Sequence, residues 1–424
     1  MSYLSELLPS FNDYAGVKKS WRRDVVAGIT VAIVALPLAL AFGITTGAGA
    51  QAGVITAIYA GLIAAVFGGS NYQVSGPTGA MTVILVPIVI KYGTQSLAPL
   101  GLVAGVIVVL MGVTHCGGLI KRVPWPVMEG FTLGIALVIA LQQLPSALAT
   151  PGISGPNTLV SAWRTLRAAI SAGLHWSSLF IVFFTLLVKF AYPKVAKRLK
   201  IRVHIPASFI AIVAASALVA LFQMHTPVIG SLPRSIFSHV SLFASHIGVA
   251  ALVVGAVQIA LLASIESLLS ARVADQMVHI HDSENGYKPN RELIGQGLAT
   301  VVSSLAGGMP ATGAIARTSV NIRARGQSRI AAITHSIFLI VVVLLLNPVI
   351  AHIPTAALAA VLIGTSYRIA SPANLRELLR TTRLDSVTLL VTAVLVVVLG
   401  LIWAIAITTA GYFLATSIQK RSAR

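Results

Sequence analysis

The sequence is short of charged residues. Only 10% of its 424 residues are charged, against about 25% in a typical soluble domain, and 56% are hydrophobic. Such a chain lacks the polar surface of a soluble protein, and its long apolar runs predict a polytopic membrane protein. No cleavable signal peptide is evident. The polar N-terminal stretch instead ends in a basic cluster at residues 18–23, which is typical of a cytoplasmic anchor.

Cysteine is nearly absent as well. Cys116 is the single cysteine, which excludes an intrachain disulfide and any multi-cysteine metal site. His279, His281 and Asp282 lie in a polar loop without further ligands nearby, so we interpret them as a solvated loop. No nucleophile, base and orienting group gather at one depth, which argues against a membrane enzyme. We therefore expect neither a metal nor a cofactor.

The formal net charge of +19 reflects where the basic residues lie. If fourteen segments cross the membrane from a cytoplasmic N-terminus, the cytoplasmic stretches hold 25 of the 30 Lys and Arg residues, Lys189 included, and the outer loops hold four. This is the positive-inside distribution of membrane proteins. Arg317 alone falls within the membrane. We predict that both termini are cytoplasmic and that the chain binds no nucleic acid.

One stretch breaks the apolar pattern of the second half. Residues 307–321 read GGMPATGAIARTSVN, with three glycines, a proline and an arginine. Such backbone leaves amides without helical partners, which is tolerated at membrane depth only where protein buries it or water reaches it. We expect a half-helix that begins at Pro310, whose missing N–H suits a first turn, and ends before Arg323. The free amides of Thr312 to Ala314 would then attract an anion.

A second copy of this pattern lies upstream. Residues 68–83 repeat the glycine pair, a proline at Pro77 and the triplet Thr78-Gly79-Ala80. A helix from Pro77 to Ile90 would extend about 21 Å at 1.5 Å per residue, too short to span a bilayer. Paired, interrupted segments at matching places in two halves indicate the binding site of a transporter.

The apolar segments number seven in each half, and an odd number inverts the second copy. The predicted fold class is an all-α polytopic membrane protein with 14 transmembrane segments, arranged as a 7+7 inverted repeat with two half-helices. Within the long uncharged run at 386–416 we expect a tight helical hairpin near Gly400. The predicted regions are a cytoplasmic N-terminal segment (1–23), the first repeat (24–222), an extracytoplasmic connection (223–246), the second repeat (247–419) and a short cytoplasmic tail (420–424).

Several motifs together resemble the sulfate permease (SulP) family of anion transporters. They are Asp24–Ile29 leading to Pro37, Gln73–Pro77, Ile265–Ala271, Gly295–Gly297 and the stretch at 308–318. The resemblance covers nearly the whole chain. It implies a core domain with an anion site between the two half-helices, and a gate domain that supports it. Members usually add a cytoplasmic STAS domain, which we expect to be missing because the sequence stops at Arg424.

The candidate substrate-binding residues come from the half-helix amides and from this resemblance. It implies that Arg317 borders the anion and that Phe42, Thr78 and Ala316 line its site. Arg317 also has a structural interpretation, either snorkelling toward the cytoplasmic surface or pairing with Glu266. The full candidate set is Phe42, Thr78, Gly79, Ala80, Thr312, Gly313, Ala314, Ile315, Ala316 and Arg317.

Glu266 is the candidate coupling residue. It lies in an otherwise uncharged run at 248–271, whereas Glu129 sits at a cytoplasmic helix end. An unpaired carboxylate inside a membrane is costly, and such residues are usually functional. Glu266 therefore either carries a proton or helps to hold a cation, with Thr312 as its partner, or it is a fixed partner of Arg317. The sequence leaves both interpretations open.

The sequence favours a secondary active transporter of inorganic or small organic anions, such as sulfate, bicarbonate or dicarboxylates, that works by alternating access. We expect a co-transported proton or sodium ion, a location in the cell membrane, and a lipid bilayer as partner; a homodimer is compatible with this reading. A nucleobase or uncharged-solute permease of related architecture would favour carboxylates over an arginine at the site. An anion channel, and a membrane enzyme or receptor that produces no flux, are further alternatives.

Overall fold

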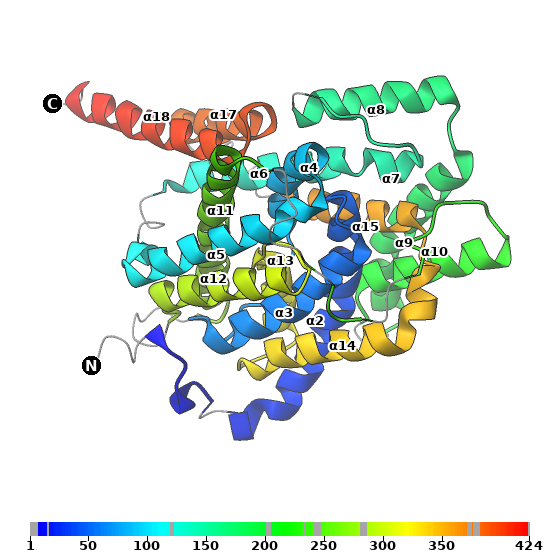
Figure 1. The fold of residues 1–424 in the computed structure, drawn as a ribbon, viewed down its shortest axis with the longest axis horizontal. Coiled ribbons are helices and arrows are strands. Elements are labelled where there is room, and N and C mark those ends of the chain that lie inside the picture. The colour runs from blue at the N-terminus through cyan, green and yellow to red at the C-terminus, as the bar shows by residue number, and fades with distance from the viewer. Residues whose placement is uncertain are drawn as a thin grey trace.

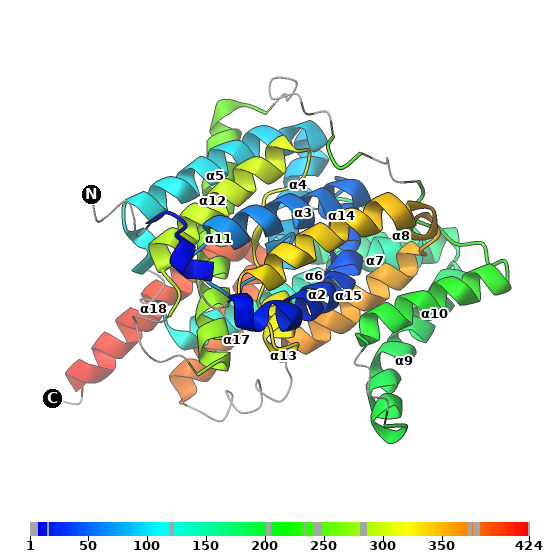
Figure 2. The ribbon, with the colours of Figure 1, turned by 90° about the horizontal axis from the view of Figure 1, so that it is seen from below.

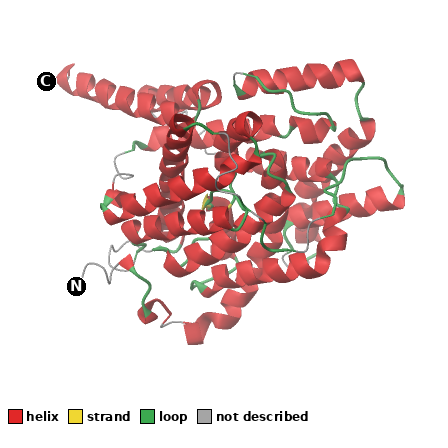
Figure 3. Ribbon diagram, in the orientation of Figure 1, coloured by secondary structure: helices red, strands yellow, loops and turns green. Residues whose placement is uncertain are grey.

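The computed structural model describes residues 7–14, 17–118, 123–155, 157–200, 205–231, 235–238, 240, 247–279, 286–370, 375 and 382–422. These residues are almost entirely helical, with two very short strands at the centre (Figure 3). The elements of the first half are η1 (Phe11–Tyr14), α2 (Val17–Thr45), α3 (Ala50–Phe67), β1 (Ser75–Gly76), α4 (Gly79–Tyr92), η2 (Thr94–Ser96), α5 (Leu97–Val113), α6 (Trp125–Gln142), α7 (Leu144–Leu148), α8 (Thr158–Ala172), α9 (Trp176–Arg198) and α10 (Ala207–Leu221). Those of the second half are α11 (Val249–Met277), α12 (Pro289–Leu305), β2 (Thr312–Gly313), α13 (Ile315–Arg323), α14 (Ile330–Ala351), α15 (Thr355–Ala370), α17 (Arg383–Leu399) and α18 (Leu401–Ser422).

The helices have the lengths and composition of a membrane domain. Within the described residues, eight helical stretches are long and apolar enough to cross a bilayer, and α4, α10 and α15 are shorter apolar helices. With α12, α13 and α17, they give the seven segments that the sequence predicts for each half. The all-α polytopic fold class is therefore confirmed.

The helices pack into two groups (Figures 1 and 2). In the first group α5, α12, α3 and α14 lie side by side, with α2 and α11 packed against them and both half-helices, α4 and α13, among them. In the second group α6 packs on α17 and α15, while α9 and α10 pack on each other and on α15. We call these groups the core and the gate. The two very short strands lie in the core.

Small residues allow the core helices to pack closely. Gly105 of α5 and Gly297 of α12 face each other, and a Cβ atom on either would come within 2.6 Å of the other's carbonyl oxygen. Gly53 of α3 lies equally close to the backbone of α2. In a bilayer, where lipid is as apolar as the side chains, this close approach of backbones drives helix association.

Several boundaries can now be compared with the expectations. The helical hairpin near Gly400 is confirmed: α17 and α18 pack against each other on either side of Gly400, whose φ is 89°. Lys189, which we counted among the cytoplasmic basic residues, is buried in α9, where its Nζ donates to the carbonyl of Val361 and to Thr365 (2.8 Å). His281 and Asp282 lie outside the described residues.

Candidate functional site

The candidate site forms where the two half-helices begin. The segments that precede them pair as an antiparallel ribbon, with Ser75 opposite Gly313 and Gly76 opposite Thr312. Each strand leads within a few residues into its own half-helix, so α4 and α13 start close together and run in opposite directions. This arrangement joins the two repeats through backbone hydrogen bonds that lipid could not supply.

Gly76 is required at this crossing. Its φ is 146°, a backbone conformation that side chains with a Cβ rarely adopt. A Cβ there would also lie 2.4 Å from Nη1 of Arg317 and 3.2 Å from Cα of Ala57 on α3. The crossing therefore has room for a glycine and for no larger residue.

Glu266 of α11 bridges the starts of both half-helices. Its Oε2 accepts hydrogen bonds from the hydroxyls of Thr78 (2.9 Å) and Thr312 (2.7 Å), the first residues of the two matching triplets. Those two hydroxyl oxygens lie 3.1 Å apart. Glu266 is only partly buried, and no described residue hydrogen-bonds to its Oε1. This second oxygen remains available to a proton or a cation.

Arg317 is buried, with 3% of its surface exposed, and it holds the opposite loop. Nη1 donates to the carbonyl of Ser75 (3.3 Å) and Nη2 donates to the carbonyl of Pro77 (2.9 Å). Among the described residues it forms no salt bridge with Glu266, so the interpretation of Glu266 as its fixed ionic partner gains no support from this geometry. Its guanidinium places a positive charge beside the start of α4.

The second half-helix begins later than the sequence predicted. We expected a start at Pro310, but α13 spans Ile315–Arg323 and is 9 residues long. The predicted free amides of Gly313 and Ala314 are also bonded, to Oγ of Ser267 (2.9 Å) and to the carbonyl of Val74 (3.0 Å). The expectation is wrong because the ribbon and α11 compete successfully for these donors.

The free amides lie one turn further on. No side chain caps α13, and among the described residues none accepts a hydrogen bond from the amides of Ile315, Ala316 or Arg317. Ala316 is exposed and Ile315 is partly exposed, so these donors face an accessible space. An uncapped N-terminus carries a partial positive charge and binds anions.

The first half-helix is capped and covered instead. Thr78 accepts a hydrogen bond from the amide of Met81 (3.4 Å), and Gly79 and Ala80 are buried. A Cβ on Gly79 would lie 2.1 Å from Cδ1 of Ile139 on α6 and 3.3 Å from Cε1 of Phe42. Phe42, 7% exposed, therefore lies beside the start of α4.

Two groups of residues at the site carry little signal in the sequence. Ser267 and Ser270 belong to the motif Ile265–Ala271, and they hold the ribbon and α13 through Gly313 and Thr318 (3.3 Å). Ile139 is one apolar residue in an apolar helix and carries no signal of its own. Its place against Gly79 depends on how the gate packs on the core.

Comparisons with known proteins agree with this architecture. A model of the sulfate permease family matches residues 21–392. The putative sulfate transporter YvdB of Bacillus subtilis is 33% identical over 395 residues, covering 92% of this chain and 72% of its own length. The bicarbonate transporter BicA of Picosynechococcus is 31% identical over 359 residues, which is 80% of this chain and 60% of that protein.

Solved structures show the same fold. The transmembrane domain of a cyanobacterial bicarbonate transporter, BicA, superposes with a TM-score of 0.80 at 25% identity, covering 94% of this chain and 98% of that one. The structure of SLC26A9 superposes with a TM-score of 0.83 at 18% identity, covering 99% of this chain and 69% of that one, and this supports the fold alone. Both comparisons span the crossing of the two half-helices and the gate helices around it.

Proposed function

Because this chain belongs to the sulfate permease family, we propose that it carries a small anion across the cell membrane by alternating access, coupled to a proton or a sodium ion. Sulfate, bicarbonate and dicarboxylates are the candidate substrates. The observation that carries the proposal is the uncapped start of α13 beside the buried guanidinium of Arg317. Both termini would be cytoplasmic.

The anion site consists mainly of backbone. The three free amides at Ile315–Arg317 point along the axis of α13, and the helix dipole adds to their partial charge. Arg317 contributes a full positive charge that is held in place by two carbonyls. Phe42 supplies an apolar wall next to Gly79. Backbone donors suit the oxygens of sulfate, carboxylate and bicarbonate alike, so this geometry selects for charge more than for shape.

The cation is assigned to Glu266. Inward movement of an anion is opposed by an inside-negative potential of about 2.3 kcal/mol per charge per 100 mV, so accumulation needs a co-transported cation or an exchanged anion. Oε2 of Glu266 is fixed by one hydroxyl from each half-helix start, while Oε1 is free. A proton or sodium ion bound there would sit next to the anion site and partly cancel its charge.

The direct test is uptake of radiolabelled sulfate and bicarbonate into proteoliposomes, with a competition panel of anions, nucleobases and uncharged solutes. We expect saturable uptake that unlabelled anions inhibit and that an imposed proton or sodium gradient accelerates. Competition by nucleobases alone would support the uncharged-solute permease. Flux that never exceeds the electrochemical gradient of the anion would support a channel.

A further inference from the structure

The two half-helices differ in how the gate covers them. When the two Thr-Gly-Ala triplets are aligned, Thr82 of α4 corresponds to Ala316 of α13, since each lies four residues after the threonine of its triplet. Thr82 is 2% exposed, whereas Ala316 is exposed. The main neighbours of α13 are α11 and α2, both in the core, whereas α4 packs on α6 of the gate. The gate therefore covers the start of α4 and leaves the start of α13 open.

Two adjacent glutamines make the polar contacts across this covered side. The hydroxyl of Thr82 donates to Oε1 of Gln142 (3.0 Å), at the end of α6. The next residue, Gln143, donates from Nε2 to the hydroxyl of Thr45 (3.2 Å), at the end of α2. Gln143 is 2% exposed. The two amides thus hold both a half-helix and a long helix of the core.

One apolar contact lies next to these amides, one turn earlier on α6. Ile139, one turn before Gln143 on α6, seats its side chain against Gly79 at the start of α4. The bare glycine backbone lets it approach to a distance that any Cβ would prevent. The contact between α6 and the core thus combines neutral hydrogen bonds with one apolar contact. It can open without exposing a buried charge, because none of these side chains is charged.

We propose that Gln142 and Gln143 form a latch that holds the core against the gate beside α4, and that this latch must release before the anion site opens on that side of the membrane. The inference rests on the proposed alternating access, and it assigns this structure to the state that is open beside α13. With the predicted topology, the latch closes the outer side and the open side is cytoplasmic.

The inverted repeat also predicts the contacts of the opposite state, which is open beside α4. When the core moves, the start of α13 should pack on a gate helix as α4 now packs on α6, and Ala316 should become buried. Gln142 and Gln143 would then lose Thr82 and Thr45 and meet water. Neutral hydrogen bonds exchanged for bonds to water change the equilibrium only modestly, which suits a contact that must break in every cycle.

Spin labels can measure the latch directly. In a Cys116→Ser background, we would label Ile90→Cys, at the exposed end of α4, and Ser171→Cys, exposed on α8, which packs on α6. Double electron–electron resonance then gives the core-to-gate distances and their populations. We expect Gln142→Ala together with Gln143→Ala to raise the ratio of long to short distances about tenfold, the effect of losing two neutral hydrogen bonds of modest net strength.

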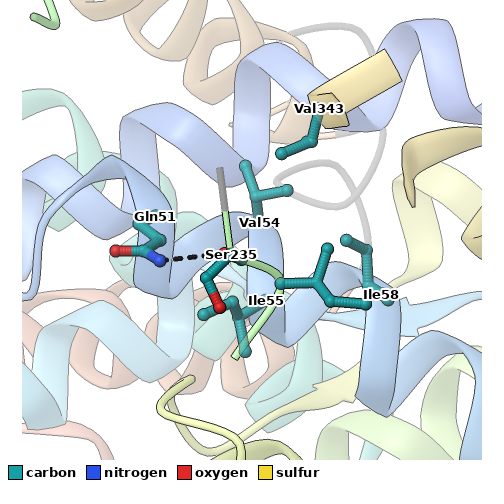
Figure 4. Close-up of a pocket in the computed structure, with 7 residues that line it drawn as sticks. Gln51, Val54, Ile55, Ile58, Ser235 and Val343 are labelled. Carbon is teal, nitrogen blue, oxygen red and sulfur yellow. Dashed lines mark hydrogen bonds between the residues drawn. The ribbon is translucent and has the colours of Figure 1, made fainter. Parts of the chain in front are cut away.

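A matched control exists on the same side of the protein. Gln51 at the start of α3 donates to the carbonyl of Ser235 (3.1 Å) beside a small apolar pocket (Figure 4), and within the described residues it bonds to no gate helix. Gln51→Ala should leave the distance populations unchanged. Equal populations in the double variant and in Gln51→Ala would overturn the latch.

A cross-link tests the same contact without weakening the fold. The pair Thr82→Cys and Gln142→Cys, joined by a bis-methanethiosulfonate cross-linker that forms a disulfide with each thiol and releases sulfinate, should keep only the short distance and stop radiotracer uptake until the link is reduced. Transport at the unlinked rate through the linked protein would contradict the proposal. If no variant transports any anion, the distance populations still decide the latch, so its failure is distinguishable from failure of the proposed function.

Discussion

The half-helices α4 and α13 start from the same Thr-Gly-Ala triplet and use it differently. In the first copy Thr78 caps its own helix, which begins at the next residue. In the second copy Thr312 and Gly313 belong to the ribbon, and the helix begins only at Ile315, without a side-chain cap. The repeated sequence therefore marks the region where each half-helix starts, while neighbouring elements decide the first helical residue and which amides remain free.

The two charged residues of the site, Arg317 and Glu266, also link the two copies unequally. Arg317 belongs to α13 but bonds to carbonyls that precede α4, so the positive charge of one copy stabilises the loop of the other. Glu266 takes one hydroxyl from each. The two copies are thus tied together at one point, and α13 alone keeps donors for a ligand.

The largest effect is expected where the copies cross. Gly76→Val would place a branched side chain at a φ of 146° and against Arg317, so the crossing could not form. Strained backbone and a displaced buried cation together should cost at least about 3 kcal/mol of stability. Thermal unfolding in detergent measures this loss. Gly118→Val, at a glycine whose added Cβ would meet no atom within 4 Å, is the control; equal melting temperatures would refute the crossing as described.

The second prediction separates coupling from anion binding. Glu266→Gln keeps the size of the side chain and an oxygen for Thr78 and Thr312, but it cannot be charged. Uptake driven by a proton or sodium gradient should be abolished, whereas anion binding should persist. Proteoliposome uptake and equilibrium binding measure the two separately. Gradient-driven uptake that survives in this variant would leave Glu266 as a structural link between the copies.

The third prediction concerns Arg317, whose guanidinium joins the two copies. Arg317→Ala should weaken anion binding roughly tenfold to a hundredfold, since a charge-assisted contact contributes about 1–3 kcal/mol. It should also lower stability, because the carbonyls of Ser75 and Pro77 lose their donor. Arg317→Lys keeps the charge without the two-pronged geometry. Recovery of stability without affinity in Arg317→Lys would show that anion binding needs the guanidinium itself, whereas unchanged affinity in Arg317→Ala would assign the residue to structure alone.

Much of this molecule could be predicted from the sequence, because the bilayer allows few solutions. Apolar segment lengths gave the helices, and the two Gly/Pro interruptions gave the half-helices. The hairpin at Gly400 followed from a run too long for one helix. The predicted placement of Glu266 near Thr312 agrees with the hydrogen bond between them (2.7 Å).

The errors came from competition between partners far apart in the chain. The amide of Gly313 could have opened a helix, but Ser267 of α11 accepts from it instead. Glu266 and Arg317 have opposite charges, yet Glu266 accepts one hydroxyl from each repeat and Arg317 donates to carbonyls of the first repeat. Local patterns identify which donors exist. The three-dimensional packing decides which of them are used.

The smallest effect is expected for the contact between the N-terminal η1 and α12 in the core. Asp13 accepts hydrogen bonds from Nη1 (3.1 Å) and Nη2 (2.7 Å) of Arg291. Burial raises the pKa of Asp13, but the hydrogen bonds from Arg291 and from the amide of Ser10 outweigh it, so the pKa lies below its ordinary value of 3.8. The pair thus stabilises the fold fully above that ordinary value and loses this contribution as the pH falls through the lowered pKa.

If the packing of the core decides which amides at the start of α13 are free, weakening the distant Asp13–Arg291 pair should not change these amides. Asp13→Asn should lower stability at neutral pH by at most about 1 kcal/mol, since Asp13 is partly exposed to solvent and asparagine keeps an oxygen for the buried Arg291. Its melting temperature should meet that of the unchanged protein near the acid end, where Asp13 is protonated in both states. Melting curves from neutral to acid pH and anion affinity at neutral pH are the measurements. An Asp13→Asn protein with wild-type stability but weakened anion binding would mean that η1 helps to set the start of α13, and the asymmetry of the half-helices would then not be a property of their crossing alone.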